Sequence, residues 1–436
     1  MNLNEFVRRR KNLMRAMGKG GISILPAAPV KFRNRDVEHS YRQDSDFYYL
    51  TGFPEPEAVA VCIPGRKHGE YILFCREKNQ EKETWHGRRA GLDGARETYG
   101  ADDAFPISDI DDILPGLLES SDRVYYAMGA QPEFDKRVMG WVNQVRERVR
   151  AGAHTPGEFL ALDHILNEMR LFKSRAEISA LKKASRITAS AHIRAMKACR
   201  PNLFEYQLEA EIVHEFTSKG ALSPAYKSIV GGGENACILH YTENADQLED
   251  GGLVLIDAGA EYDYYAADIT RTFPVGGKFS APQRAIYELV LAAQQAAIRK
   301  ARPGNHWNDP HDAAVRCLTK GLLELGLLKG GSVTKLIRDG AYKKFYMHRT
   351  GHWLGMDVHD VGDYKVDDKW RLLEPGMVFT IEPGLYIEPG AKGVAKKWQG
   401  IGVRIEDDVL ITRDGCEVLT AAAPKKVADI EALMQV

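Results

Sequence analysis

Over about the first 170 residues, short apolar runs alternate with segments of helical periodicity such as Phe134 to Arg150. Short apolar runs between polar segments are typical of strands, and strands that alternate with helices favour an α/β arrangement. We therefore expect an α/β domain at the N-terminus. Its apolar runs read ISIL, AVAVCI, EYILFC and VYYAM.

A long helix is expected directly after this region. Ser174 with Glu177 three residues later makes a capping box, and the next apolar or small residues follow at intervals of three and four until Pro201. We therefore predict a boundary that gives two domains, residues 1–173 and 174–436. The residues on the predicted helix face are Ile178, Leu181, Ser185, Thr188, His192, Ala195 and Cys199.

The same capping signature occurs twice more, as Asn202 with Glu205 and as Ser280 with Gln283. It predicts two further helices, the first ended by Gly220 and the second by Pro303 and Gly304. Because strands separate and follow these helices, we expect an α+β C-terminal domain rather than a doubly wound sheet. The predicted strands read LVLIDAG, ADITRTFPV, MVFTIEPG and IGVRIEDDVLIT.

Size and composition exclude several functions. A chain of 436 residues fits two domains, and 59 Lys plus Arg against 60 Asp plus Glu give no overall field for nucleic acid or anionic membranes. We find no apolar run of membrane-spanning length and no signal peptide. The six scattered cysteines form no C-x-x-C pair, which favours a reducing cytoplasm. A small molecule or another protein is the expected partner.

The nearest approach to a phosphate-binding loop is GGGEN, from Gly231 to Asn235. It lacks the spacing of a P-loop, and no G-x-G-x-x-G follows a strand. We interpret it as a flexible turn beside a site.

Two aspartates lie in apolar strand contexts, although aspartate is depleted from strands. Asp257 ends LVLI and Asp268 lies in YYAADITRTF, so a hairpin that turns at Tyr262 and Asp263 would place the two opposite each other. Opposed like charges repel, and a cation between them would remove that repulsion. The alternative is that one or both lie in the turn and face water.

Two glutamates strengthen the case for a cation. Glu382 ends the strand VFTIEPG, and period-two alternation puts Gly402, Arg404 and Glu406 on one strand face. Singly, each glutamate could be a solvated strand residue. Together the carboxylates suit two divalent cations, with manganese favoured by oxygen ligands and cobalt, iron or zinc as alternatives. Such a pair can share a hydroxide of lowered pKa, which is hydrolase chemistry.

The segment HRTGHWLGMDVHD begins with His348 and His352, whose spacing of four would put both on one helix face. The sequence does not match a zinc-protease helix of the H-E-x-x-H type, because no glutamate follows His348 and glycines at 351 and 355 disfavour a helix. We expect a loop, and one of its histidines could supply an imidazole ligand beside the carboxylates.

These motifs resemble those of the metallopeptidases with the pita-bread fold, which include methionine aminopeptidases, prolidases, aminopeptidases P and the metal-free creatinases. The matching pieces are ILHYTEN, LVLIDAG, ADITRTFPV, GHWLGMDVHD, EPGMVFTIEPG and GVRIEDD. The N-terminal stretch RNRDVEHSYRQDSDFYYLTGFPEPEAV resembles the N-terminal domain of aminopeptidase P. The resemblance implies a C-terminal α+β pita-bread domain preceded by a smaller α/β domain.

The resemblance also implies roles for individual residues. Asp268 and Glu406 would bridge two metals, Asp257 would complete one site, and His352 with Glu382 the other. Residues around the metals would be His240, His348, His359 and Arg404, which position substrate, stabilise the intermediate or assist proton transfer. On the same strand face, Arg404 would orient Glu406. Arg349 stands where a glycine is often expected, so the surface on the leaving-group side would differ.

The implied activity is hydrolysis of the bond before proline in the second position of a peptide. The metal-bridging hydroxide would attack the carbonyl, His359 would help to stabilise the oxyanion, and Glu382 would carry a proton to the leaving nitrogen. Trp85 would reach the active site of a neighbouring subunit in a homodimer or homotetramer, unless it is a buried core residue. The alternatives are a prolidase, a creatinase-like enzyme without metal and an inactive binding scaffold.

Overall fold

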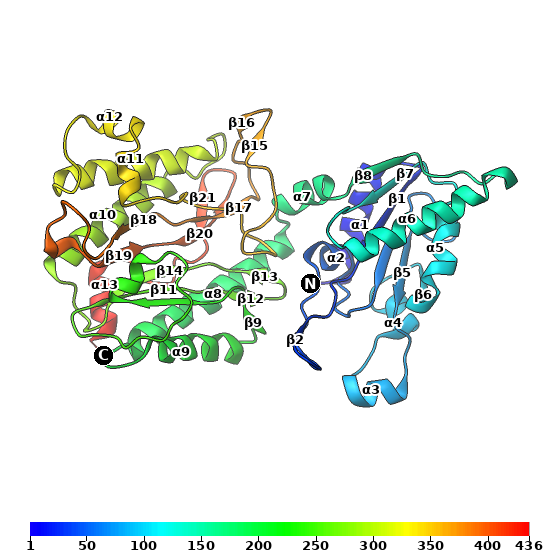
Figure 1. Cartoon of the computed structure of the whole chain (residues 1–436), viewed down its shortest axis with the longest axis horizontal. Helices are drawn as coiled ribbons and strands as arrows, with labels where there is room; N and C mark the ends of the chain where they lie inside the picture. Colours follow the sequence, from blue (N-terminus) through cyan, green and yellow to red (C-terminus); the bar gives the residue numbers. More distant parts are fainter. Residues whose placement is uncertain (436) are drawn as a thin grey trace. The chain divides into compact units, whose positions relative to one another are not determined.

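The computed structural model describes residues 1–435 and divides into two compact units, Met1–Met169 and Arg170–Val436. Figure 1 shows the elements of each unit. No helix among the described residues combines the length and the apolar composition needed to cross a membrane.

The first unit is built on one mixed six-stranded sheet with the order β6-β5-β4-β1-β7-β8. β1 pairs antiparallel with β4 and parallel with β7, so the sheet changes direction at its centre. The strands are β1 (Gly21–Pro26), β4 (Val59–Cys62), β5 (Tyr71–Cys75), β6 (Asp103–Pro106), β7 (Arg123–Tyr126) and β8 (Glu158–Ala161).

Helices α5 and α6 pack on this sheet through a core that includes Leu114, Trp141 and Phe74. The alternation of strands and helices therefore predicted the class of this unit correctly. The remaining elements are α1 (Leu3–Met17), β2 (Phe32–Asn34), β3 (Val37–Glu38), α2 (Ser45–Thr51), α3 (Gln80–His86), α4 (Gly91–Glu97), α5 (Ile110–Leu118), α6 (Pro132–Glu147) and α7 (Asp163–Leu171).

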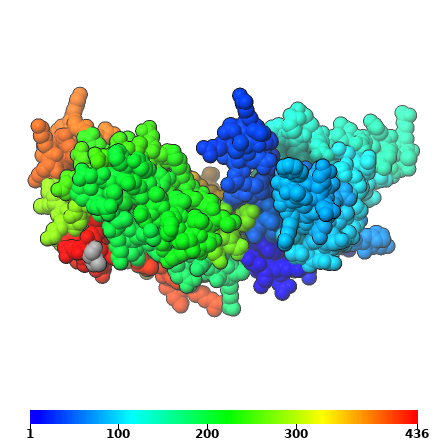
Figure 2. All heavy atoms as spheres, turned by 90° about the horizontal axis from the view of Figure 1, so that it is seen from below, coloured from blue at the N-terminus to red at the C-terminus, as the bar shows by residue number. Residues whose placement is uncertain are grey.

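The second unit places small sheets between two groups of helices (Figure 1). Helices α8 and α9 lie against β9, β10, β12 and β13, while α10 contacts β17, β18 and β19. In Figure 2 the green segments, which include α8 and α9, form much of the surface of this unit on the side seen. The helices are α8 (Arg175–Ala198), α9 (Glu205–Ser218), α10 (Ala281–Ile298), α11 (Asn308–Glu324), α12 (Val333–Arg338) and α13 (Val427–Met434).

The strands of this unit form several short sheets, with β10-β11-β14, β13-β12-β9 and β17-β20-β21 as the three-stranded ones. They are β9 (Ser223–Pro224), β10 (Ile229–Gly232), β11 (Leu253–Asp257), β12 (Ala260–Tyr262), β13 (Tyr265–Ala266), β14 (Thr270–Pro274), β15 (Lys365–Val366), β16 (Lys369–Trp370), β17 (Val378–Ile381), β18 (Gly384–Ile387), β19 (Ile401–Arg404), β20 (Asp407–Ile411) and β21 (Cys416–Val418).

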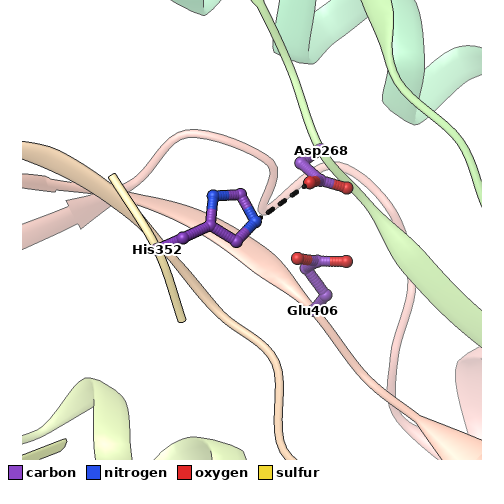
Figure 3. Close-up of side chains that lie close together, drawn as sticks. All are labelled: Asp268, His352 and Glu406. Carbon is purple, nitrogen blue, oxygen red and sulfur yellow. Dashed lines mark ion pairs between the residues drawn. The ribbon is translucent and has the colours of Figure 1, made fainter. Parts of the chain in front are cut away.

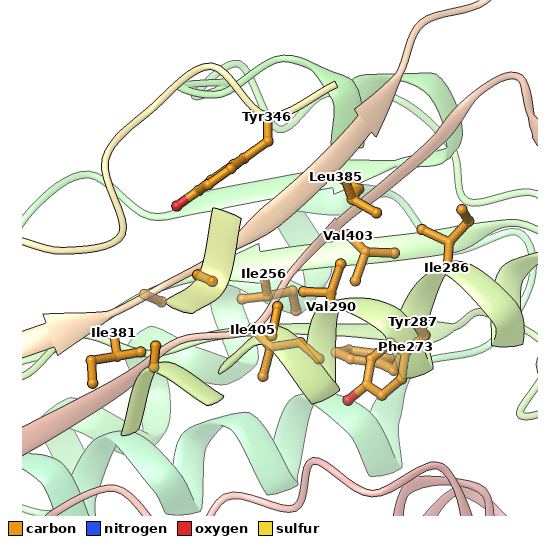
Figure 4. Packing of buried hydrophobic residues seen from close by; sticks show 14 of the residues in the cluster. Ile256, Phe273, Ile286, Tyr287, Val290, Tyr346, Ile381, Leu385, Val403 and Ile405 are labelled. Carbon is orange, nitrogen blue, oxygen red and sulfur yellow. The ribbon is translucent and has the colours of Figure 1, made fainter. Parts of the chain in front are cut away.

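The core of the second unit joins these sheets to α10. Figure 4 shows Ile256 and Phe273 from β11 and β14 packed with Ile286, Tyr287 and Val290 from α10. Val403, Leu385 and Ile405 lie in the same cluster and are fully buried. The apolar alternate residues of IGVRIEDD therefore hold the strand in the core, and the polar residues between them reach the site.

The capping predictions have different outcomes. The box at the start of α8 is confirmed, since the Ser174 N–H donates to Glu177 Oε2 at 2.9 Å and the Glu177 N–H to Ser174 Oγ at 3.3 Å. Before α9 the prediction is wrong, because Phe204 precedes the helix and its N–H donates to Gln207 Oε1 at 2.9 Å. Glu205 is buried and bonds elsewhere.

The hairpin between the two aspartates turns one residue later than predicted. Asp263 and Tyr264 occupy the turn with φ of 51° and 68°, and Tyr262 pairs with Tyr265. In this register Asp257 pairs with Thr270, so the predicted direct opposition to Asp268 is wrong. Because the shift is two residues, both aspartates keep the same face and become diagonal neighbours.

The segment IGVRIEDDVLIT is two strands rather than one. β19 pairs with β18 and β20 pairs with β17, and Glu406 lies in the break between them. All residues from 401 to 411 are buried, so neither face of the predicted strand is open to water.

Candidate metal centre

A cavity of about 1050 Å³ lies in the second unit. The nine sequence-predicted site residues of this unit all line it, although they come from strands and loops far apart in the sequence. They are Asp257, Asp268, His352, Glu382, Glu406, His240, His348, His359 and Arg404. The tenth, Trp85, lies on α3 of the first unit and is 79 % exposed, so it is not a buried core residue.

Asp257 and Asp268 meet at the hydroxyl of Tyr226. The Tyr226 oxygen lies 2.6 Å from Asp257 Oδ1 and within hydrogen-bond distance of Asp268 Oδ1. A phenol has one proton to donate, so it cannot satisfy both carboxylates. Burial and the two aspartates raise the pKa of Tyr226 well above its ordinary value, which keeps the hydroxyl protonated. Tyr226 was missed in the sequence because nothing local connects it to either aspartate.

Asp268, His352 and Glu406 converge from three separate segments. One ligand atom of each lies within 4.8 Å of the others, and Figure 3 shows the imidazole and both carboxylates facing one another. His352 Nδ1 is 3.0 Å from the Trp353 carbonyl oxygen, which leaves Nε2 directed at Asp268 Oδ2, 3.4 Å away. A histidine fixed through one nitrogen and free at the other is prepared to bind a metal.

The charges at this point are unbalanced. Burial raises the pKa of Asp268, and the Asp257 charge adds to the effect. Burial also raises the pKa of Glu406 well above its ordinary value, and the charges of Asp268 and Glu382 add to this effect. Burial lowers the pKa of His352, but Asp268 and Glu382 outweigh it and raise that pKa to about 9. These residues attract positive charge, and oxygen-rich clusters of this kind suit hard divalent cations.

Glu382 completes the ring of carboxylates. Its Oε1 is 3.8 Å from His352 Nε2, and its Oε2 is 3.8 Å from His348 Nδ1. Burial raises its pKa to about 7 against the opposing effect of His352. The strand that carries it is tied to the histidine segment, since the Glu382 N–H donates to the Thr350 carbonyl at 2.8 Å.

Arg404 contacts a different carboxylate from the one predicted. Its Nη2 donates to Asp257 Oδ2 at 2.8 Å, while Nε donates to Thr270 Oγ1 at 3.1 Å. Thr270 Oγ1 in turn donates to Glu406 Oε2 at 2.6 Å, so this hydroxyl links Arg404 to Glu406 by hydrogen bonds. Burial raises the pKa of Asp257, but Arg404 outweighs it and holds that pKa below its ordinary value.

The three histidines beside the carboxylates differ in environment. His348 Nε2 is 2.8 Å from the Tyr386 hydroxyl, and burial lowers the pKa of His348 to about 3. His359 stacks edge-on against His352 with ring centroids 4.3 Å apart, and burial lowers its pKa too. His240 is exposed at the cavity wall. Neutral imidazoles at His348 and His359 can each offer one N–H and one acceptor.

The segment from His348 to Asp360 is a loop, as predicted. A buried ion cluster holds its far end, because Asp360 accepts from Lys173 Nζ at 2.9 Å and from Arg170 at 2.6 Å. Gly355 leaves the space for that carboxylate, since a Cβ there would lie 2.0 Å from Asp360 Oδ2. The loop therefore has a fixed path past the site.

Arg349 lines the cavity beside His348. Its guanidinium stands 5.0 Å from the centroid of Trp370 and donates to Asn308 Oδ1. Lys365 lies 4.8 Å from the same ring. No acidic side chain within residues 1–435 forms an ion pair with either cation, so this wall of the cavity is positively charged.

Comparisons with known proteins agree with this geometry. Residues 179–413 match the model of metallopeptidase family M24, and residues 6–125 match the aminopeptidase P N-terminal domain. The Xaa-Pro aminopeptidase of Escherichia coli K12 is 49% identical over 431 residues, which cover 99% of this chain and 97% of that protein. The Haemophilus influenzae Xaa-Pro aminopeptidase is 47% identical with the same coverage.

Solved structures of aminopeptidases are similar to this chain over its whole length. The Pseudomonas aeruginosa aminopeptidase PepP has a TM-score of 0.99 and 63% identity, covering 100% of this chain and 98% of that one. An E. coli aminopeptidase P in complex with substrate has a TM-score of 0.97 and 49% identity over 100% and 98% of the two chains. The fold is an aminopeptidase P N-terminal domain followed by a pita-bread domain. The chain belongs to metallopeptidase family M24.

Proposed function

We propose that this metallopeptidase is an Xaa-Pro aminopeptidase, which removes the N-terminal residue from peptides with proline in the second position. The observation that carries the proposal is the convergence of Asp268, His352 and Glu406 in one cavity, in a chain 49% identical to an enzyme of that name. Its substrates would be peptides.

We further propose that five residues hold two divalent cations, most naturally Mn²⁺: Asp257, Asp268, His352, Glu382 and Glu406. The fit rests on the donor set, since four carboxylates and one imidazole line one cavity, with Asp268 and Glu406 buried and Asp257 and Glu382 half-buried. When bound, two such ions lower the pKa of a shared water and polarise the scissile carbonyl. Burial first, and the neighbouring carboxylates next, raise the pKa values of Asp268 and Glu406, and this supports the fit because a bound cation would stabilise both ionised forms.

The chain's own residues would orient the substrate and stabilise charge. Arg404 holds Asp257 in place, and the Tyr226 hydroxyl lies between Asp257 and Asp268 and can donate to one of them. We assign His359 to the developing oxyanion and His240 and His348 to substrate binding, because all three line the cavity. Glu382 would carry the proton to the leaving proline nitrogen.

Proline specificity requires recognition of a ring, since the Xaa-Pro amide has no N–H to bind. The cavity offers apolar and aromatic surface for this purpose next to the carboxylates. Its apolar lining residues include Ile229, Leu239, Trp307, Val358, Tyr364 and Trp370.

The test is to load the protein with Mn²⁺ and compare Xaa-Pro-Yaa tripeptides, Xaa-Pro dipeptides and Xaa-Ala peptides. We expect cleavage of the tripeptides with strong dependence on proline. Cleavage of dipeptides alone would indicate a prolidase, and indifference to proline a general aminopeptidase. Failure to take up metal would indicate a binding scaffold.

Three further features stay proposals. We propose a homo-oligomer, a dimer or tetramer, with the exposed Trp85 at a subunit contact. We propose a cytoplasmic location, which the scattered free cysteines favour. The domain boundary between residues 173 and 174 also stays a prediction; the compact units meet at Met169 and Arg170.

A further inference from the structure

Glu205, at the start of α9, is a fully buried carboxylate with a complete set of donors. Its Oε1 accepts from the Gly232 N–H at 2.7 Å and from Asn235 Nδ2 at 3.0 Å. Its Oε2 accepts from the Tyr241 hydroxyl at 2.8 Å and from the Asp246 N–H at 2.9 Å. All four donors lie in one segment, residues 231–246, which we call the His240 loop.

A second glutamate on the same helix face holds the end of this loop. Glu209, four residues after Glu205, accepts from Asn244 Nδ2 at 2.9 Å. Asn244 is 1 % exposed, accepts from the Val230 N–H at 2.9 Å and donates to the Ser228 carbonyl at 2.9 Å. Helix α9 therefore contacts both ends of the His240 loop through carboxylates one turn apart.

The middle of the loop faces the cavity. Leu239, His240 and Thr242 line it, and His240 is exposed there. Between them Tyr241 is 7 % exposed and points the other way, into a small core with Tyr386. Because Tyr241 directly follows His240 in the chain, fixing the Tyr241 hydroxyl also restrains the backbone that carries His240.

We propose that Glu205 is a positioning residue, which fixes the His240 loop as a rigid wall of the cavity and so presents His240 to the peptide. The effect on catalysis rests on the function proposed above. Among residues 1–435, no hydrogen bond or ion pair joins Glu205 to a proposed metal ligand. Its influence therefore passes through the loop. The GGGEN segment, whose glycines suggest a flexible turn, is instead held by this carboxylate.

A carboxylate is required here because four donors converge on it. Glutamine has the same shape, but its amide would direct N–H groups at two of those donors and lose both bonds. Bonds to a charged acceptor are also the stronger ones. Glu205→Gln therefore loosens the loop without removing side-chain volume.

The test measures kcat and KM on an Xaa-Pro-Yaa tripeptide for the wild-type protein, Glu205→Gln, His240→Ala and the double variant. Glu211→Gln is the matched control, since Glu211 lies on the same helix but pairs with Arg194. We expect Glu205→Gln to lower kcat/KM by about 10- to 100-fold, as displaced substrate-binding groups do. In the His240→Ala background the same change should cost less than about threefold, because coupled residues are not additive.

Equal losses in both backgrounds, or no loss from Glu205→Gln, would overturn the proposal. If Glu205→Gln does not fold, Tyr241→Phe takes its place, because it removes one hydrogen-bond donor to Glu205 and keeps the ring. We expect it to lower kcat/KM by a few fold in the wild-type background and by less in the His240→Ala background. Mn²⁺ uptake should be unchanged in every Glu205 variant.

Hydrogen exchange provides a readout that does not need activity. Amides of residues 231–246 should exchange faster in Glu205→Gln than in Glu211→Gln, with the rest of α9 unchanged. Unchanged exchange in the loop would contradict the positioning role even if the protein hydrolyses no Xaa-Pro peptide. Wild-type protein that takes up Mn²⁺ but does not cleave would contradict only the proposed function.

Discussion

Asp268 is a residue whose charge suits metal binding and opposes folding. In the metal-free protein, burial and Asp257 raise its pKa, so the ionised form is unfavourable where it stands. Asp268→Asn keeps an acceptor for Tyr226 and removes the charge. We expect Mn²⁺ uptake and activity to be lost together.

Asp268→Asn should not destabilise the metal-free protein, although it removes activity. The free energy of unfolding of the metal-free protein should stay equal or rise by up to about 1 kcal/mol, as relief of like-charge repulsion predicts. Urea unfolding in the presence of a chelator measures it. A loss above about 2 kcal/mol, or full activity, would count against the assignment of Asp268 as a ligand.

We expect Arg349 to affect the choice of peptide, because it lines the cavity. With Lys365 it makes one wall of the cavity cationic, so a peptide with a free C-terminal carboxylate should be preferred over its amide. Arg349→Gly should lower kcat/KM for the acid by about two- to fivefold, the range of an exposed charge pair, and leave the amide nearly unchanged. Exposed Arg338→Gly, on α12, is the control. Equal effects on acid and amide would mean that Arg349 acts on the backbone of the loop instead.

Sequence reasoning recovers the side chains of the site better than their partners. Asp257 and Glu406 stand out because a carboxylate in an apolar strand is unusual. Their contacts with Tyr226 and Thr270 depend on packing between segments that share no local pattern. For the same reason Arg404 was paired with the carboxylate on its own strand face and not with Asp257.

At the level of elements, local patterns predicted helices well and their ends less well. Ser174 and Glu177 form the predicted box, in which Glu177 Oε2 accepts from the Ser174 N–H while its Oε1 accepts from the Tyr265 hydroxyl at 3.0 Å. Glu205 has the same position relative to Asn202, but four donors from the His240 loop bind its carboxylate instead. A spacing of three residues cannot distinguish a cap from a tertiary contact.

Helix α8 carries a pH-sensitive contact in its buried face. His192 is fully buried, and its Nε2 lies 3.1 Å from the carbonyl oxygen of Ala258, next to the end of β11. Burial, helped by Arg271, lowers the pKa of His192 from 6.5 to about 4. At pH values between about 4 and 6.5, His192 is therefore protonated in the unfolded chain and neutral in the folded chain.

The free energy of unfolding should therefore fall as the pH falls from about 6.5 to 4, with up to about 3 kcal/mol attributable to this histidine. His192→Gln keeps an N–H donor for Ala258 but does not titrate. Urea unfolding at several pH values should show the wild type more stable at pH 7 and the difference shrinking towards pH 4. A difference that stays constant with pH would show that His192 does not carry this dependence.

At the scale of the whole molecule, the chain has two units with separate cores. Residues such as Trp141 form the core of the first, and Ile256 and Val290 belong to that of the second. The order of strands and helices along the chain predicted the α/β class of the first unit and the α+β class of the second. It could not predict how the short strands pair into several small sheets, because that pairing depends on contacts between residues far apart in the chain.

The proposed ligands all lie in the second unit, so metal should stabilise that unit selectively. A ligand that binds only the folded state at 100 times its dissociation constant adds about 2.7 kcal/mol. In calorimetry, addition of Mn²⁺ to chelator-treated protein should raise the melting temperature of one transition and leave another in place. Asp268→Asn should show no such rise. Two transitions that move together would mean that both units unfold as one cooperative structure, and no movement at all would remove the support for a metal centre.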